Sequence, residues 1–268
     1  MKTLRLASCM AENTESVCCA IAEYIQLKLD IPTEYVSGIP WQERESLFDC
    51  GEIQLLWLCG LPYVHKADLA ESSMELLAVP VPAGVRYQAK PVYFSDVVVR
   101  GDSPVRRFAD LRRATWAYNE PRSHSGYNVV RAYLAELGES DNFFGAVVET
   151  GAHANSLQMI LTGAVGGAAI DSTVLEWLGS QRAGLADEIR VIDTLGPSPI
   201  PPWVISRRVT EFQRHELRQL LCDMHLDPDG REILARGRLR RFGTAQDRDY
   251  DPIREMACKA ERVSFGFH

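Results

Sequence analysis

The stretch Ser123-His124-Ser125-Gly126 lies between a β-like run, Thr115 to Tyr118, and a helical pattern that begins at about Tyr127. A strand that ends at small hydroxyl residues just before a helix leaves the first helical N–H groups without partners. Beside two side-chain hydroxyls, those N–H groups form a cradle for an anion. This stretch therefore predicts an α/β architecture together with an anion site at a strand-to-helix turn.

The composition is that of a globular chain of one large domain or two modest lobes. It has 268 residues, of which 46% are hydrophobic, and its formal net charge is -7. Negative net charge disfavours a nucleic-acid surface as the main function, although an acidic protein can still hold an anion locally. No apolar run reaches the roughly 18 residues of a membrane span, so none is predicted.

The first residues of the chain and its cysteines indicate the cellular compartment in which the protein works. Met1 to Cys9 is a short β-like run that leads directly into a helical pattern, without the apolar stretch of an export signal. The seven cysteines are an odd number without a CxxC pair, which is typical of reduced thiols. We therefore expect a cytoplasmic protein as the sequence stands, or a periplasmic one if a leader has been removed.

The first third of the chain alternates strands and helices. Leu4–Ser8, Thr33–Val36 and Ile53–Cys59 are apolar, strand-like runs, and helical patterns separate them. A β-α-β-α-β order predicts a parallel sheet with right-handed crossovers.

Two further strand-to-helix turns follow the opening motif. A strand over Phe143–Thr150 leads through Gly151-Ala152-His153 to a helix that we expect from about Asn155. A small-residue strand over Gly166–Ile170 leads to Asp171-Ser172 at the start of another helix. In an open α/β sheet, such turns share the carboxyl edge where ligands bind.

Two segments suit passages between lobes. Pro91–Arg100 is a long, β-branched run, and Leu195–Pro202 contains four prolines and reads as a rigid connector to a return strand at Val204–Ser206. The sequence thus predicts a two-lobed clamshell in which each lobe is a mostly parallel sheet flanked by helices. We expect residues 1–95 with 204–268 in lobe 1 and residues 96–203 in lobe 2.

At this point the sequence resembles a known family, the phosphate/phosphite/phosphonate substrate-binding proteins of ABC transporters, which have the type-2 periplasmic-binding-protein fold. The resemblance covers most of the chain and rests on spaced motifs. In chain order they are Leu56-Trp57-Leu58-Cys59-Gly60-Leu61-Pro62-Tyr63, Ser123-His124-Ser125-Gly126, Thr150-Gly151-Ala152-His153, Ala168-Ala169-Ile170-Asp171-Ser172 and Tyr250-Asp251-Pro252-Ile253.

The resemblance implies a set of ligand-binding residues. Hydroxyls and helix-terminal amides of Ser123 to Ser125 would grip an oxyanion, and His153 would be a ligand-facing histidine. Asp171 would meet an amine on the ligand, and Tyr63 and Tyr93 would contact it from the first lobe. The family commonly has a small hydroxyl residue where this chain has His124, which we expect to change the cradle's volume and to add a titratable group.

Each of these residues also has a plainer interpretation. Ser123, Ser125 and Asp171 are good helix caps, His153 can be a hydrogen-bonded loop histidine, and Tyr63 and Tyr93 can be core aromatics. A Ser125-His153-Asp171 triad lacks the G-x-S-x-G elbow of many hydrolases, because Ser123 stands two residues before Ser125. No two histidines have metal-ligand spacing, so we predict no metal and no cofactor.

The sequence therefore favours binding of a small anionic ligand, phosphonate-, phosphate- or carboxylate-like, in the cleft between two lobes. An ABC permease or a signalling partner would then act with the protein. The alternative is a cytosolic enzyme on the same fold, of the chorismate-dehydratase-like or pyrimidine-synthase-like kind, with its histidines and aspartate as proton-transfer groups. We favour the binding protein over the enzyme.

Overall fold

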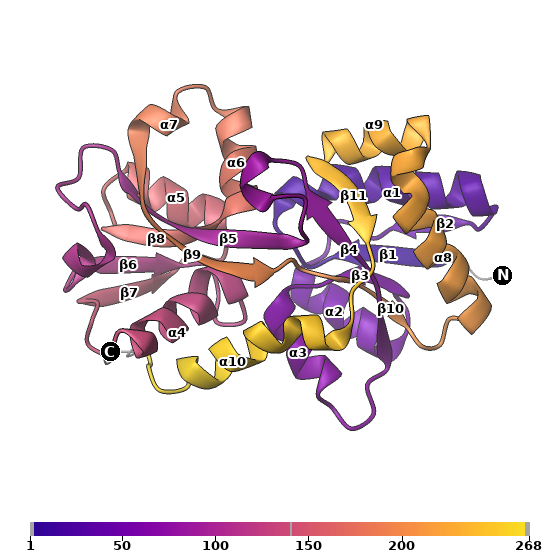
Figure 1. The fold of residues 1–268 in the computed structure, drawn as a ribbon, viewed down its shortest axis with the longest axis horizontal. Coiled ribbons are helices and arrows are strands. Elements are labelled where there is room, and N and C mark those ends of the chain that lie inside the picture. Colours follow the sequence, from indigo (N-terminus) through magenta and orange to yellow (C-terminus); the bar gives the residue numbers. More distant parts are fainter. Residues whose placement is uncertain (1–2, 140, 266–268) are drawn as a thin grey trace. The chain divides into compact units, whose positions relative to one another are not determined.

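The computed structural model describes residues 3–139 and 141–265, and these form two compact units (Figure 1). Unit 1 contains the chain up to Val92 together with Pro199–Tyr250, and unit 2 contains Tyr93–Ser198 and the chain from Asp251 onward. Each unit has one sheet with helices packed against it, which is the predicted α/β class.

Unit 1 has a six-stranded sheet in the order β11-β4-β10-β3-β1-β2. Its strands are β1 (Leu4–Ser8), β2 (Thr33–Tyr35), β3 (Leu55–Trp57), β4 (Met74–Pro82), β10 (Trp203–Ser206) and β11 (Leu239–Gly243). Its helices are α1 (Glu15–Leu29), α2 (Trp41–Cys50), α3 (Gly60–Ala67), α8 (Glu211–Asp223) and α9 (Pro228–Arg236). The pairs β1/β2 and β1/β3 are parallel, as the β-α-β-α-β pattern predicts, whereas β10 is antiparallel to β3 and β4, and β11 to β4. The mostly parallel arrangement is thus confined to the β2-β1-β3 half of the sheet.

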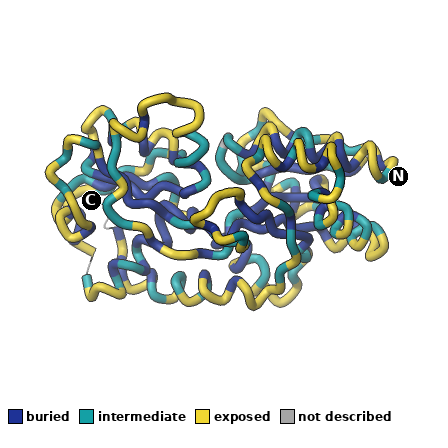
Figure 2. Tube along the Cα trace, turned by 45° about the horizontal axis from the view of Figure 1, so that its top comes forward, coloured by how far each residue is buried: buried dark blue, intermediate teal, exposed yellow. Residues whose placement is uncertain are grey.

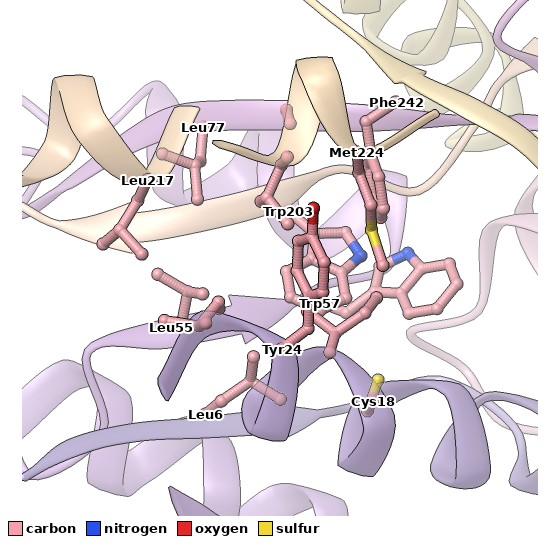
Figure 3. Close-up of a cluster of buried hydrophobic side chains, with 14 of the residues drawn as sticks. Leu6, Cys18, Tyr24, Leu55, Trp57, Leu77, Trp203, Leu217, Met224 and Phe242 are labelled. Atoms are coloured by element: carbon pink, nitrogen blue, oxygen red, sulfur yellow. The ribbon is translucent and has the colours of Figure 1, made fainter. Parts of the chain in front are cut away.

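The core of unit 1 lies between this sheet and helices α1, α8 and α9. Figure 3 shows Trp57 and Trp203 side by side with Met224 and Phe242, and the ring centroids of the two tryptophans are 5.6 Å apart. The Trp57 indole N–H donates to the Pro201 carbonyl at 3.0 Å, so its polar atom is satisfied in the buried environment.

Unit 2 has a five-stranded sheet in the order β7-β6-β8-β5-β9. Its strands are β5 (Val92–Arg100, with Val92 in unit 1), β6 (Thr115–Tyr118), β7 (Ala146–Glu149), β8 (Gly167–Asp171) and β9 (Ile189–Pro199, with Pro199 in unit 1). Its helices are α4 (Val129–Glu136), α5 (His153–Leu161), α6 (Ser172–Gln181), α7 (Leu185–Glu188) and α10 (Asp251–Ala260), and a π-helical turn, His124–Asn128, precedes α4. Strand β6 is parallel to β7 and β8, and β5 is antiparallel to β8.

Alternating residues of the unit 2 strands build two cores. Trp116 and Tyr118 pack on the face covered by α4 and α10, whereas Ala117 packs on the face covered by α5 and α6. Because successive strand residues point to opposite faces, a sheet covered on both sides needs this continuous apolar pattern. The three central strands β5, β6 and β8 are mostly buried, whereas the edge strands β7 and β9 are mostly intermediate or exposed; Figure 2 draws buried stretches dark blue.

Two strands and the end of the chain differ from the sequence expectations. Residues 195–199 continue strand β9 instead of forming a connector. Strand β9 lies at the edge of the sheet, where a proline can face the side that has no neighbouring strand and so breaks no inter-strand hydrogen bond. Strand β11 is not evident from the sequence, since Arg240 and Arg241 interrupt its apolar pattern; edge strands tolerate such charges. The chain from Asp251 onward packs with unit 2 rather than with the first lobe, because α10 runs along α4 (Figure 1).

Candidate functional site

The parallel strands of unit 2 end at a common edge, and each end carries polar side chains. Beyond β6, β7 and β8 lie the turns that contain Ser123, His153 and Asp171. Hydrogen bonds join the first two turns directly, because the Thr150 N–H donates to the Tyr118 carbonyl at 2.9 Å and the Gly151 N–H to the Asn119 carbonyl at 2.8 Å. The predicted convergence of these turns on the carboxyl edge is therefore present within unit 2.

The serine motif forms the first turn of the helix. Ser123 is its N-cap, and the Ser123 hydroxyl accepts a hydrogen bond from the Gly126 N–H at 3.1 Å. The helix begins at His124 with one π-helical turn, three residues before the predicted start near Tyr127. Ser123 Oγ and Ser125 Oγ are 3.4 Å apart, so both hydroxyls lie together at the start of the helix.

Ser125 is paired with His153, the first residue of α5. The Ser125 Oγ and His153 Nε2 atoms are 2.9 Å apart, and each residue is 5% exposed. Burial lowers the pKa of His153 to about 4, so the imidazole is neutral at pH 7. Its second nitrogen, Nδ1, is buried and has no hydrogen-bond partner among residues 3–139 and 141–265. The serine–histidine cluster, Ser123, Ser125 and His153, thus combines two hydroxyls with a buried nitrogen that lacks a partner.

Because Gly126 has no side chain, Asn119 and His153 can approach the first turn of the helix. A Cβ at this position would lie 2.0 Å from Asn119 Oδ1 and 3.2 Å from His153 Cε1, so the Asn119 amide and the His153 ring both approach the glycine closely. Asn119 Oδ1 is also buried, and none of the described residues donates a hydrogen bond to it. Asn119 was not predicted as a site residue; its only sequence signal is an amide residue directly after a strand.

Both ring nitrogens of His124 form hydrogen bonds inside unit 2. The Asn128 amide donates to His124 Nδ1 at 3.1 Å, which places the ring proton on Nε2, and Nε2 then donates to the Ser198 hydroxyl at 3.0 Å. The ring is fully buried, and burial lowers its pKa to about 3. With both nitrogens bonded inside the unit, the His124 ring is neutral at physiological pH, and its expected contact with a ligand stays a prediction.

Asp171 caps helix α6 at the end of β8. Its Oδ1 accepts from the Thr173 N–H at 2.8 Å and from the Thr173 hydroxyl at 2.7 Å. Burial, with a smaller contribution from Asp96, raises the pKa of Asp171 to about 6 in spite of these hydrogen bonds. The carboxyl group therefore changes its charge close to physiological pH.

The two tyrosines belong to different units. Tyr93, in unit 2, is 1% exposed and its ring lies edge-on to His124, with 6.4 Å between the ring centroids. Tyr63, in unit 1, lies in the first turn of α3; its hydroxyl donates to Asp247 at 2.7 Å and its ring packs on Tyr250. Unit 2 thus brings Ser123, Ser125 and His153 together, while Tyr93 packs against His124 beside them.

The geometry does not assemble a Ser-His-Asp triad. His153 bonds Ser125 through Nε2, but no carboxylate of the described residues accepts a hydrogen bond from Nδ1. Asp171 Oδ1 is bonded to Thr173 instead. A triad needs an acidic residue on the second histidine nitrogen to hold the tautomer in place. Among the described residues, Ser125 and His153 therefore form a hydrogen-bonded pair without the carboxylate of a triad.

Comparison with known proteins identifies the family. Residues 10–250 match the family model of the periplasmic substrate-binding protein of phosphonate ABC transporters. The chain belongs to this family. The Escherichia coli (strain K12) phosphonates-binding periplasmic protein is 24% identical to the chain over 220 residues, which are 78% of the chain and 62% of that relative.

Solved structures show the same fold. The binding component of an ABC phosphonate transporter from Pseudomonas aeruginosa has a TM-score of 0.83 at 17% identity, covering 97% of this chain and 86% of its own. A protein from Prochlorococcus marinus solved with methylphosphonate also has a TM-score of 0.83, at 18% identity, covering 98% and 99%. The prediction of a type-2 periplasmic-binding-protein fold is therefore confirmed.

The family is periplasmic in the matched description, and the comparisons lend no support to the cytoplasmic location that the sequence favours. In the portion of the chain that the structure describes, no helix has the length and apolar character to cross a membrane.

Proposed function

We propose that this protein binds a small phosphonate-type oxyanion, with the anionic head held by the serine–histidine cluster of unit 2. The observation that carries the proposal is the Ser125–His153 pair at 2.9 Å, with His153 Nδ1 buried and lacking a protein partner. Leaving a buried polar atom without a hydrogen-bond partner costs about 1–3 kcal/mol of free energy. A ligand that supplies the partner removes this cost, which favours binding. Membership of the phosphonate-binding family supports the same ligand class.

The cluster suits an oxyanion because its groups are neutral donors. When His153 Nε2 accepts from the Ser125 hydroxyl, the proton of the neutral ring is on Nδ1. The Nδ1–H group and the Ser123 hydroxyl are then the donors to the anion at the start of the helical run from His124 to Glu136, and Ser125 holds the ring in place. Hydrogen bonds to a charged group contribute about 1.5–3 kcal/mol each. We therefore expect the loss of one hydroxyl to weaken binding by about 10- to 100-fold.

The remaining predicted residues would contact the rest of the ligand. In this proposal Asp171 meets a positively charged amine on ligands that carry one, with a strength that rises as the carboxyl group ionises near pH 6. Tyr93 and Tyr63 add aromatic or hydroxyl contacts, and His124 supports the cradle through Asn128 and Ser198 instead of touching the ligand.

We further propose that the protein acts in the periplasm and delivers its ligand to an ABC permease. The family's description supports both parts of this proposal. Pull-down of the membrane fraction with the ligand-saturated protein, compared with the ligand-free protein, tests the partner.

Calorimetry tests the ligand. Purified protein is titrated with methylphosphonate, phosphite, phosphate, sulfate and acetate, and we expect a phosphorus oxyanion to bind well below millimolar concentration. Ser125→Ala removes one hydroxyl of the cluster. Ser180→Ala is the control, because the Ser180 hydroxyl donates to the Trp177 carbonyl and accepts from the Gln181 amide, both in its own helix α6. Binding that is absent for all five anions, or equal in Ser125→Ala and Ser180→Ala, contradicts the proposal.

A further inference from the structure

The motif Tyr250-Asp251-Pro252-Ile253 is not explained by the anion site. The chain leaves unit 1 for unit 2 between Tyr250 and Asp251, which is one of three such passages. The others lie between Val92 and Tyr93 and between Ser198 and Pro199. The motif is therefore the third covalent connection between the units.

All three connections are joined to one another by hydrogen bonds on the unit 1 side. The Ile200 N–H donates to the Pro91 carbonyl at 3.0 Å, which ties the second connection to the first. The Tyr250 hydroxyl donates to the Ile200 carbonyl at 2.8 Å, which ties the third connection to the second. Tyr250 is 1% exposed, so this bond is made away from water, where it is strongest.

Tyr250 also contacts a predicted ligand-binding residue. Its ring packs on Tyr63 with 4.6 Å between the centroids and a tilt of 54°. The Tyr63 hydroxyl donates to Asp247 at 2.7 Å, in the turn that ends at Tyr250. The first turn of α3 and the three connections are thus linked through one pair of tilted aromatic rings in contact.

We propose that Tyr250 is a positioning residue that couples ligand contact at Tyr63 to the three segments joining the units. This inference rests on the proposed function, because it assumes that Tyr63 meets the ligand. A displacement of the Tyr63 ring on ligand binding moves the Tyr250 ring, and the hydroxyl of Tyr250 passes that movement to Ile200 and hence to Pro91. Ligand occupancy and the relative movement of the two units are then linked through Tyr250.

The test uses Tyr250→Phe, which keeps the aromatic ring that packs on Tyr63 and removes only the hydroxyl. Tyr24→Phe is the matched control, because the Tyr24 hydroxyl donates to Asp227 at 2.9 Å within unit 1 and neither residue adjoins a connection. In ligand-free protein, we expect amide hydrogen exchange at Ile200 to be roughly tenfold faster in Tyr250→Phe and unchanged in Tyr24→Phe.

The coupling is measured with methylphosphonate. We expect Tyr250→Phe to bind it several-fold more weakly and to lose most of the ligand-induced change in radius of gyration, measured by small-angle scattering. Equal scattering changes in Tyr250→Phe, Tyr24→Phe and the wild type overturn the inference, as does unchanged exchange at Ile200. If the wild type binds no anion, the proposed function fails, and the exchange at Ile200 still decides whether Tyr250 fastens the connections.

Discussion

Replacing Gly126 by alanine tests the packing that brings the site together. The new Cβ would lie 2.0 Å from Asn119 Oδ1 and 3.2 Å from His153 Cε1. An ordinary carbon contact is about 3.5 Å, so the Asn119 oxygen has to move by more than about 1 Å. The Gly151 N–H donates to the Asn119 carbonyl and holds the main chain there. The Asn119 side chain and the His153 ring are therefore the groups that have to move.

The magnitude follows from two opposing effects. Overpacking of a tight site costs about 1–3 kcal/mol, whereas alanine in place of glycine within a helix gains about 0.5–1 kcal/mol. We therefore expect Gly126→Ala to lower the free energy of unfolding by about 1–2 kcal/mol. The displaced His153 ring also weakens its bond to Ser125, so oxyanion affinity falls by roughly tenfold or more.

Urea denaturation followed by circular dichroism measures the stability, and calorimetry measures the affinity. Gly179→Ala is the control, because Gly179 lies inside α6 with no atom within 4 Å of an added Cβ, and it gains the helical stabilisation without a clash. The double variant Gly126→Ala/Asn119→Ala removes the 2.0 Å contact, and we expect it to recover part of the lost stability.

A specific result would refute this reasoning. If Gly126→Ala is as stable as Gly179→Ala and binds the oxyanion as the wild type does, Asn119 and His153 do not converge on Gly126.

The buried ionisable groups lead to two further predictions. Burial lowers the pKa of His124 to about 3 and of His153 to about 4, from an ordinary histidine pKa of about 6.5. At a pH below about 6.5 each ring therefore gains a proton when the protein unfolds, so the free energy of unfolding falls on acidification. Between pH 7 and pH 5 we expect His124 to account for about 2 kcal/mol of that loss, so in denaturation series His124→Gln shows a shallower pH dependence; an unchanged slope contradicts a neutral, buried ring. Asp171 acts in the opposite direction, since its raised pKa of about 6 gives stability that is present below pH 4 and lost as the pH rises through 6. The stability of Asp171→Asn relative to the wild type is therefore expected to improve from pH 4 to pH 7, and a constant difference contradicts the raised pKa.

Local sequence patterns predicted much of the fold. Strand β6 occupies Thr115–Tyr118 as expected, the Asp171 side chain caps α6, and helix α1 follows β1. These features depend on alternating burial and on cap residues, which are properties of a few neighbouring positions. Strand β11 and the end of β9 were missed, because charged residues and prolines are tolerated at a sheet edge, and the position of an edge is known only once the strands have paired.

The sequence by itself determined that three strand-to-helix turns of the second unit carry polar groups at one edge, since the order of strands and helices specifies that edge. The tertiary structure alone decided which of those groups meet. Packing pairs Ser125 with His153, 28 residues away, turns His124 toward Asn128 and Ser198, and places Asn119 against Gly126. The physical reason is that periodicity records which face of an element is buried, whereas a hydrogen bond between distant residues depends on how whole elements pack against one another.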